Sequence, residues 1–266
     1  MKKRVGILTS GGDCPGLNAT IRGVAKALYA RMGDNVEIVG ILNGYHGLIN
    51  GEYREMCEDD FRGILTLGGT ILGTKRTPFK LMRVVEDDKI DKVAAMKKTY
   101  KDAKLDCLLC LGGNGTHKTA NLLSQEGLNI IGLPKTIDND IYGTDVTFGF
   151  HTAVDIATEV IDRIHTTATN RIAAAVQKKT GMETRVCIPG HMQRGGSPSA
   201  YDRVLATQFG SYAAKLVEIE QYGVTVALVN NHVISNRLED IAGKTRNIPE
   251  GCELLTVAKR MGISLG

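Results

Sequence analysis

Continuously apolar runs alternate with amphipathic stretches along most of the chain. The apolar runs are short and predict buried strands at residues 4–9, 36–42, 105–111, 129–133, 185–188 and 224–229. Apolar residues at three- and four-residue spacing predict helices at 19–31, 90–100, from about 116, at 150–165 and at 201–217. Strands that are apolar throughout and alternate with helices are typical of a parallel sheet covered on both faces. The pattern therefore predicts an α/β fold with a Rossmann-like, three-layer sheet.

The alternation is interrupted once. The helical pattern at 150–165 runs almost directly into 171–179, which is helical again. No strand pattern occurs between residues 133 and 185, where a doubly wound sheet would supply one. The junction therefore does not fit the alternation of strands and helices in the rest of the chain.

Composition and charge narrow the class of protein. A chain of 266 residues, 42% hydrophobic and 23% charged, is long enough for one large domain or two ordinary ones and is not disordered. No apolar run approaches the roughly 20 residues of a membrane helix, and the apolar segment after the basic N-terminus is too short for a signal peptide. The net charge of +4 is spread along the chain. We therefore expect a cytoplasmic protein that binds neither nucleic acid nor membrane, with an anionic small molecule still possible.

Two of the six cysteines form a C-x-x-C pattern, which raises the possibility of redox or zinc chemistry. Cys107 and Cys110 lie within the predicted strand at 105–111, however, and residues three apart on a strand point to opposite faces. The pattern is therefore expected to be structural.

Polar, glycine-rich motifs follow several of the predicted strands, where ligands of α/β sheets bind. The first is Thr9–Asn18, and the second, Leu111–Lys118, also leads from a strand into a helix. Glycines allow a ligand to approach the backbone, and a helix N-terminus attracts phosphate. The first motif has neither Walker A nor dinucleotide-binding spacing, so a tight turn with a helix cap explains it equally well. Lys118 fits a solvated helix residue better than a phosphate ligand.

Two further motifs carry acid–base and anion-binding groups. In Pro134–Asp140, the carboxylates Asp138 and Asp140 share a face if the loop is extended, which suits one general base and one metal ligand. The alternative is an Asx-rich turn that caps a helix. In Pro189–Pro198, His191 and Arg194 are suited to bind a phosphorylated substrate, with Arg185 and Arg203 close in sequence.

Together these four motifs, with Gly149-Phe-His-Thr-Ala153 following the first three, resemble the phosphofructokinase family, and the resemblance covers nearly the whole chain. It implies a transferase, a kinase of glycolysis, that moves a phosphoryl group from ATP to the C1 hydroxyl of fructose 6-phosphate. It also implies Mg²⁺, a product of fructose 1,6-bisphosphate and a cytoplasmic homotetramer.

The resemblance also implies roles for individual residues. Asp138 is the implied base, Thr136 lies beside the sugar, and the Gly12 amide with Arg76 steadies the phosphoryl group. The nucleotide is implied to contact Gly12, Tyr45, Arg76, Gly112, Gly115 and Thr116. The sugar phosphate is implied to contact Arg185, His191 and Arg194, and the metal to contact Asn114 and Asp140. Arg185 is implied to reach in from a neighbouring subunit. Arg22 matches an effector-site arginine, but a solvated helix arginine explains it as well.

Three residues give mixed indications about the phosphoryl donor and metal. Asn114 stands where the family usually has aspartate, so Asp140 is the better candidate for the metal. Gly115 resembles the ATP-dependent branch, whereas Lys135 resembles the pyrophosphate-dependent branch. We favour ATP because Gly115 leaves space for the nucleotide, with a pyrophosphate-dependent enzyme as the alternative.

Compared with the family, a block of strands and helices is missing where Thr169-Asn170 adjoins Arg171. The resemblance implies a nucleotide-binding domain of residues 1–149 with about 195–245. It also implies a second, smaller α/β domain of about 150–194 with 246–266, which binds sugar phosphate and is truncated at 169–171. Because of the truncation, a catalytically inactive, nucleotide-binding or regulatory chain is a further alternative. Lipid and NAD kinases share a similar glycine loop, but are not expected to carry the third and fourth motifs.

Overall fold

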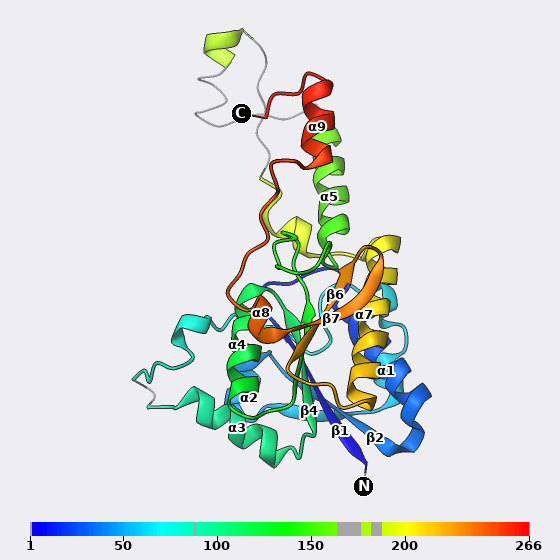
Figure 1. The fold of residues 1–266 in the computed structure, drawn as a ribbon, viewed down its shortest axis with the longest axis vertical. Helices are drawn as coiled ribbons and strands as arrows, with labels where there is room; N and C mark the ends of the chain where they lie inside the picture. The colour runs from blue at the N-terminus through cyan, green and yellow to red at the C-terminus, as the bar shows by residue number, and fades with distance from the viewer. Residues whose placement is uncertain (1, 88, 164–176, 182–187, 266) are drawn as a thin grey trace.

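The computed structural model of the protein describes residues 2–87, 89–163, 177–181 and 188–265. A seven-stranded sheet forms its centre, in the order β3-β2-β1-β4-β5-β6-β7 (Figure 1). The strands are β1 (Lys3–Ser10), β2 (Val36–Ile41), β3 (Tyr53–Met56), β4 (Cys107–Gly112), β5 (Ile130–Pro134), β6 (Val224–Val229) and β7 (His232–Arg237). Those from β2 to β6 run parallel, as the apolar runs predict.

The two edge strands differ from the prediction of a wholly parallel sheet. β3 pairs with β2 and β7 with β6, both antiparallel. Their sequences, Tyr-Arg-Glu-Met and His-Val-Ile-Ser-Asn-Arg, are polar and mostly half-exposed or exposed. Edge strands tolerate such residues because only one side pairs with a neighbour. Neither segment therefore contains the continuous apolar run from which the inner strands were predicted.

Helices cover both faces of the sheet. On one side in Figure 1 lie α1 (Leu17–Met32) and α7 (Ala200–Glu218); on the other lie α2 (Tyr45–Asn50), α3 (Lys92–Asp102) and α4 (Asn114–Gln125). The short α8 (Leu238–Ile241) follows β7 and contacts α4. Each side has its own apolar core, which confirms the three layers expected from the sequence.

The close contact between α1 and α7 depends on glycine. A Cβ atom added to Gly210 would lie 2.5 Å from the carbonyl oxygen of Thr20, and one added to Gly23 would lie 2.9 Å from that of Thr207. The two backbones therefore touch, which fixes α7 against the helix that follows the first glycine-rich motif.

The cysteine pattern is structural, as expected from the strand. Cys107 packs in the core on the α1 side and Cys110 in the core on the α3 side, so their side chains point to opposite faces. Burial raises the pKa of Cys110 to about 12, which leaves its thiol protonated and unreactive at neutral pH.

The helices α5 (Phe150–Arg163) and α9 (Glu253–Arg260) extend beyond the end of the sheet at which the parallel strands finish (Figure 1). Among the described residues, this part contains helices and turns but no second sheet. The predicted strand at 185–188 lies almost wholly outside the described residues, as do Arg185 and the junction at 169–171. The assignment of residues 150–194 and 246–266 to a second domain therefore stays a prediction.

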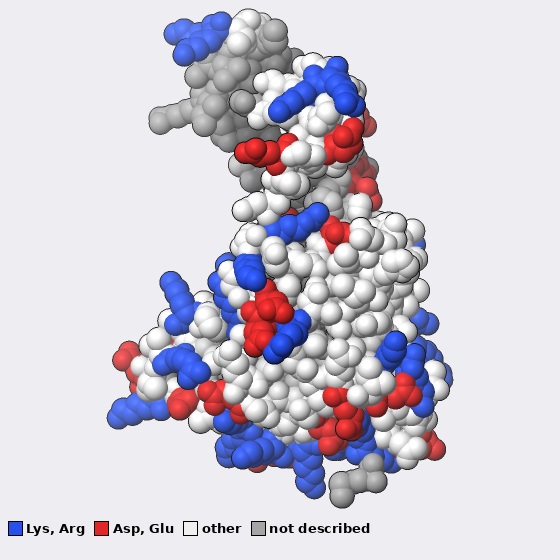
Figure 2. Space-filling view, in the orientation of Figure 1, with Lys and Arg blue, Asp and Glu red and all other residues white. Residues whose placement is uncertain are grey.

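Surface charge agrees with the weak net charge of the sequence. On the face drawn in Figure 2, lysine and arginine are interspersed with aspartate and glutamate. Within the part of the chain that the structure describes, no helix has the length and apolar character needed to cross a bilayer.

Candidate active site

Three of the sequence motifs meet at the carboxyl ends of neighbouring parallel strands. In the sheet register Ser10 at the end of β1 lies beside Gly112 at the end of β4, and Gly112 lies beside Pro134 at the end of β5. The loops that follow these residues therefore start at the same level. This is the position at which open α/β sheets bind ligands.

The first loop is shaped by glycine and held by the segment that leads to Arg76. Gly16, with a φ of 99°, turns the chain into α1. The buried side chain of Asn18 binds the backbone of residues 67–71 through hydrogen bonds to Leu67, Gly68 and Ile71. Thr74 donates to the Gly11 carbonyl at 2.6 Å. Arg76 follows this segment, is exposed, and makes no hydrogen bond with any described residue, so its guanidinium is available to an anion.

Lys135 places a positive charge beneath the first loop. The side chain is buried, and its Nζ donates a hydrogen bond to the carbonyl of Gly12. Its backbone N–H donates to the carbonyl of Gly112 at 3.0 Å, so one residue joins all three loops. Burial, reinforced by the nearby charge of Arg194, lowers the pKa of Lys135 below its usual range.

Asp138 stands on the third loop as an exposed carboxylate of fixed orientation. Its backbone N–H donates to the Thr136 hydroxyl at 3.1 Å, and that hydroxyl donates to Asp138 Oδ2 at 3.3 Å. Asn139 adopts a left-handed conformation with a φ of 51° and accepts a hydrogen bond from the Thr147 N–H. The Thr136 hydroxyl thus closes a turn over residues 136–138, and no helix follows among the described residues 139–149 that the loop would cap, unlike in the alternative considered from the sequence. This turn leaves the Asp138 carboxylate open to a substrate.

Asn114 and Asp140 form a direct contact between the second and third loops. The Asn114 amide donates to Asp140 Oδ2 at 2.8 Å and to its carbonyl at 3.3 Å. An aspartate at position 114 would bring two carboxylates together here, whereas the amide donates to its partner. Arg246, which no sequence motif indicated, donates its backbone N–H to the Asp140 carbonyl at 2.8 Å. The carboxylate of Asp140 is therefore oriented by Asn114, while its backbone carbonyl is held by both Asn114 and Arg246.

The residues expected on the nucleotide side differ in accessibility. Tyr45 is only 1% exposed, and its hydroxyl donates to the Thr116 carbonyl at 2.9 Å, so its side chain supports the second loop from the core. A Cβ atom at Gly112 would lie 2.1 Å from the Thr116 Oγ1, which explains the glycine. Gly115 is exposed, and a Cβ atom there would meet nothing within 4 Å. The space expected beside Gly115 is present.

The fourth motif reaches the first loop through Arg194. His191 and Arg194 belong to the 3-10 turn η6 (Gly190–Arg194), which is tied to α5 by a hydrogen bond from Gln193 to the Ala153 carbonyl. A Cβ atom at Gly12 would lie 2.7 Å from Arg194 Nη1, so the guanidinium lies directly against this glycine. His191 is exposed and makes no hydrogen bond with a described residue. Arg203, considered as an anion ligand, instead donates to the Pro198 carbonyl.

The geometry therefore brings Gly12, Lys135, Asp138 and Arg194 to one place, with Asn114 and Asp140 beside them. A family model described as phosphofructokinase matches residues 4–172 and 168–217 of the chain. The chain belongs to the phosphofructokinase family. The two matched pieces overlap at residues 168–172, the place at which the sequence predicts a missing block, between residues 169 and 171.

Several curated relatives are similar over nearly their whole length. A protein of Spirochaeta thermophila named ATP-dependent 6-phosphofructokinase is 42% identical, with 98% of this chain and 97% of the relative covered. A protein of Bacteroides thetaiotaomicron named ATP-dependent 6-phosphofructokinase 3 is 36% identical, with 99% of this chain and 100% of the relative covered. A protein of Amycolatopsis mediterranei named pyrophosphate–fructose 6-phosphate 1-phosphotransferase is 33% identical, with 92% of this chain and 96% of the relative covered. The first match spans 356 positions, more than the 266 residues of this chain, so that relative contains residues that this chain lacks.

Solved structures share the phosphofructokinase fold. The phosphofructokinase of Pichia pastoris superposes with a TM-score of 0.77 at 23% identity and covers 98% of this chain, which spans only 37% of that much longer protein. A pyrophosphate-dependent phosphofructokinase from Marinobacter aquaeolei gives a TM-score of 0.78 at 16% identity. The match covers 93% of this chain and 86% of the Marinobacter protein.

Two buried residues that sequence reasoning missed hold the phosphofructokinase site in shape. The first is His117, which is 1% exposed. Its Nδ1 lies 3.0 Å from the Gly113 carbonyl and its Nε2 lies 2.9 Å from the Thr225 hydroxyl, so it ties the second loop to β6. Burial lowers the pKa of His117 below its usual value of about 6.5.

The pKa of His117 predicts a loss of stability in mild acid. Below about pH 6.5 the unfolded chain protonates this imidazole while the folded chain resists protonation, so the unfolded state binds more protons and is favoured. Lowering the pH from 7 to 5 is expected to reduce the free energy of unfolding by about 1 kcal/mol more in the wild type than in His117→Asn. Urea titrations between pH 7 and pH 5 measure this difference in the free energy of unfolding. The control is His232→Asn, since His232 is exposed on the edge strand β7. Equal pH slopes in all three proteins would contradict the assignment.

The second is Asp202, a fully buried carboxylate at the start of α7. Its Oδ2 accepts hydrogen bonds from the Thr152 N–H at 2.7 Å and the Thr152 hydroxyl at 2.5 Å. The Ser199 N–H donates in turn to that hydroxyl at 2.9 Å. Asp202 therefore joins the first turns of α5 and α7, the two helices that flank η6 and Arg194.

Asp202→Ala is expected to lower the free energy of unfolding by about 2 kcal/mol, because the buried Thr152 groups lose their acceptor. Urea unfolding measures the change. Asp155→Ala removes an exposed carboxylate from α5 and should have little effect. Equal stability of Asp202→Ala and Asp155→Ala would show that Asp202 does not hold α5 and α7 together.

Proposed function

We propose that the chain transfers a phosphoryl group from ATP to the C1 hydroxyl of fructose 6-phosphate, giving fructose 1,6-bisphosphate in glycolysis. The observation that carries this proposal is the convergence of Asp138, Lys135 and Arg194 on the Gly12 loop. This arrangement combines an accessible base with two cations. Transfer of a phosphoryl group to an alcohol requires such groups, a base for the hydroxyl proton and positive charge for the phosphate. The names of the Spirochaeta and Bacteroides relatives support ATP as the donor.

In the proposed mechanism Asp138 accepts the proton of the C1 hydroxyl as that oxygen attacks the terminal phosphorus of ATP. The Thr136 hydroxyl, which donates to Asp138 Oδ2, keeps the carboxylate oriented. Charge that develops on the transferred group is stabilised by the Gly12 amide and by Arg76, whose guanidinium is free of other partners among the described residues. The product then leaves as a phosphate ester with ADP.

The sugar phosphate is proposed to bind Arg194 and His191 from η6. Arg185 would complete this subsite from a neighbouring subunit, in keeping with the proposed homotetramer. Exposed apolar residues on α5 and α9, among them Ile161 at 69% and Leu254 at 79%, support self-association of this region. We place such an assembly in the cytoplasm.

Mg²⁺ fits the oxygen ligands beside the third loop. No group of three or more His, Cys, Asp or Glu side chains suited to a metal occurs among the described residues. Asp140, oriented by the Asn114 amide, would therefore hold the ion together with phosphate oxygens, as magnesium sites with one or two carboxylates do. When bound, Mg²⁺ neutralises charge on the phosphates.

Pyrophosphate is the second candidate donor, and Lys135 is the observation that favours it. Its buried ammonium is suited to a compact anion, and the Amycolatopsis relative is named for pyrophosphate. The exposed Gly115, with open space around it, favours ATP instead. Initial rates of fructose 1,6-bisphosphate formation, measured by a coupled assay with each donor separately, decide between them. We expect a higher kcat/KM with ATP; product from pyrophosphate alone would reverse the assignment.

The sheet supports one part of the proposed division into domains. Residues 1–149 and about 195–245 share β1 to β7, α1 and α7, and we propose that they form the nucleotide-binding domain. About 150–194 and 246–266 are proposed to form the sugar-phosphate domain, truncated at 169–171. An inactive, nucleotide-binding or regulatory chain is the alternative that the truncation favours. Binding of ATP with no product from either donor would support that alternative.

A further inference from the structure

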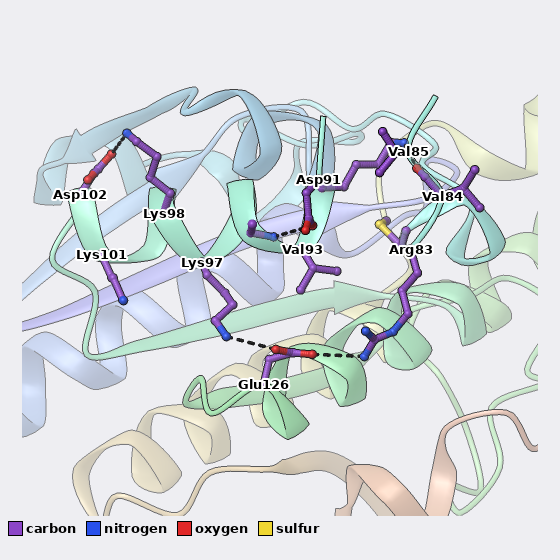
Figure 3. Close-up of a pocket in the computed structure, with 13 residues that line it drawn as sticks. Arg83, Val84, Val85, Asp91, Val93, Lys97, Lys98, Lys101, Asp102 and Glu126 are labelled. Carbon is purple, nitrogen blue, oxygen red and sulfur yellow. Dashed lines mark hydrogen bonds and ion pairs between the residues drawn. The ribbon is translucent and has the colours of Figure 1, made fainter. Parts of the chain in front are cut away.

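A second polar cavity lies on the outer side of α3, between this helix, residues 82–85 and the end of α4 (Figure 3). Its volume is about 610 Å³. Glu126 on its wall follows α4 and precedes β5, so this part of the cavity lies toward the opposite end of the sheet from Asp138. None of the residues assigned to phosphoryl transfer lines it.

Positive charge predominates on the walls of the cavity. The lining contains the cations Arg83, Lys92, Lys97, Lys98 and Lys101 against the carboxylates Asp91, Asp102 and Glu126, and Lys92 is paired with Glu86 at 2.8 Å. The carboxylate of Glu126 is shared, since Lys97 Nζ lies 3.1 Å from one oxygen and Arg83 Nη2 lies 3.2 Å from the other (Figure 3). One negative charge therefore neutralises two cations only in part.

The side chain of Lys101 has no counter-ion among the residues that the structure describes. It follows Lys97 by one helical turn, and both side chains extend from the same face of α3 (Figure 3). The Lys101 ammonium makes no ion pair or hydrogen bond with a described residue, whereas Lys98, on the other side of the helix, pairs with Asp102 at 2.5 Å. The uncompensated charge is thus concentrated on the side that faces Glu126 and Arg83.

An apolar wall adjoins these cations. Val84 and Val85 are 45% and 58% exposed, while Met82 and Val93 line the cavity as buried side chains. A bare inorganic ion would leave this wall in water, whereas the carbon skeleton of an organic anion would cover it.

We propose that the cavity binds a small organic anion that carries phosphate or carboxylate groups. The anion contacts Lys97, Lys101 and Arg83, and its charged group replaces Glu126 as the partner of Arg83 and Lys97. Arginine offers two parallel N–H donors to such a group. Glu126 competes with the ligand in this arrangement, so its removal has the opposite effect to removal of a lysine.

Calorimetric titration of the full chain with malonate, and separately with inorganic phosphate, tests the proposal. Lys101→Gln is expected to weaken binding roughly fivefold, and Glu126→Gln to strengthen it by a similar factor. Lys259→Gln, which removes an exposed lysine from α9, leaves the affinity unchanged. Lys101 is exposed and unpaired, so its variant is expected to fold normally, which circular dichroism checks.

Binding at the candidate active site is distinguished by Arg194→Gln. Retained affinity in Arg194→Gln with loss in Lys101→Gln supports the cavity on α3; the reverse pattern overturns it. Binding of malonate alone identifies carboxylates as the ligand class, and binding of phosphate alone identifies phosphate esters. No binding of either anion, or equal affinity in Lys101→Gln, Glu126→Gln and the wild type, contradicts the proposal.

Discussion

Asp138→Asn is expected to lower the kcat for fructose 6-phosphate by about a thousandfold, with a much smaller change in KM. An amide cannot accept the C1 hydroxyl proton, and general-base catalysis typically contributes factors of 10² to 10⁴. The substitution keeps the size of the side chain, and the hydrogen bond from the Asp138 N–H to Thr136 does not involve the carboxylate. Steady-state kinetics with the donor that gives product measures the loss.

The control for Asp138→Asn is Asp34→Asn, which removes an exposed carboxylate from the turn after α1. It should retain full activity. A tenfold or smaller loss of kcat in Asp138→Asn would show that another group accepts the proton. A loss accompanied by lower thermal stability would point to a folding defect, so both variants are compared by urea unfolding.

Lys135→Met is expected to lower kcat/KM by about a hundredfold while changing stability little. The ammonium lies beneath the Gly12 loop beside Arg194, where it contributes positive charge toward the phosphates of the donor. Methionine fills a similar volume without charge, and the lost hydrogen bond is expected to cost only about 1 kcal/mol of stability. The Gly12 carbonyl loses its donor, which we expect to loosen the loop.

Lys244→Met provides a matched control for Lys135→Met, because Lys244 is exposed and lies over the Tyr142 ring. Its activity should equal that of the wild type. Full activity of Lys135→Met with both ATP and pyrophosphate would remove Lys135 from the donor site. Loss with pyrophosphate alone would restrict its role to that donor.

Much of the fold follows from the sequence because the inner strands are buried on both sides. Residues 107–111 are apolar throughout and residues 224–229 are apolar except for Thr225, and both segments lie in strands of the parallel core. Helix boundaries were less certain. The helix predicted at 90–100 spans 92–102, because the Asp91 side chain caps it by accepting a hydrogen bond from the Ala94 N–H.

The supporting residues of the site were beyond sequence reasoning, because their contacts join distant segments. His117 bonds to Thr225, Asp202 to Thr152, and the Arg246 backbone to Asp140. None of these pairs has a characteristic spacing along the chain. A buried polar residue can be recognised only when its partners are known. Tyr45 illustrates the same point, since its place in the core depends on how α2 packs.

The motifs themselves were informative because glycines and acidic residues mark the ends of strands. The register of β1, β4 and β5 brings the first three motifs together, as expected from their positions after strands. Arg194 reaches Gly12 from a segment far along the chain, which the motif alone did not indicate.

The central claim is that these 266 residues phosphorylate fructose 6-phosphate despite the missing block. The most direct measurement is the ³¹P NMR spectrum of the purified chain, its intact mass verified as 28.7 kDa, after incubation with Mg²⁺, ATP and fructose 6-phosphate. We predict the loss of the ATP γ-phosphate signal with the appearance of ADP and a new C1 phosphate ester. Unchanged fructose 6-phosphate in a sample that binds ATP would contradict the claim.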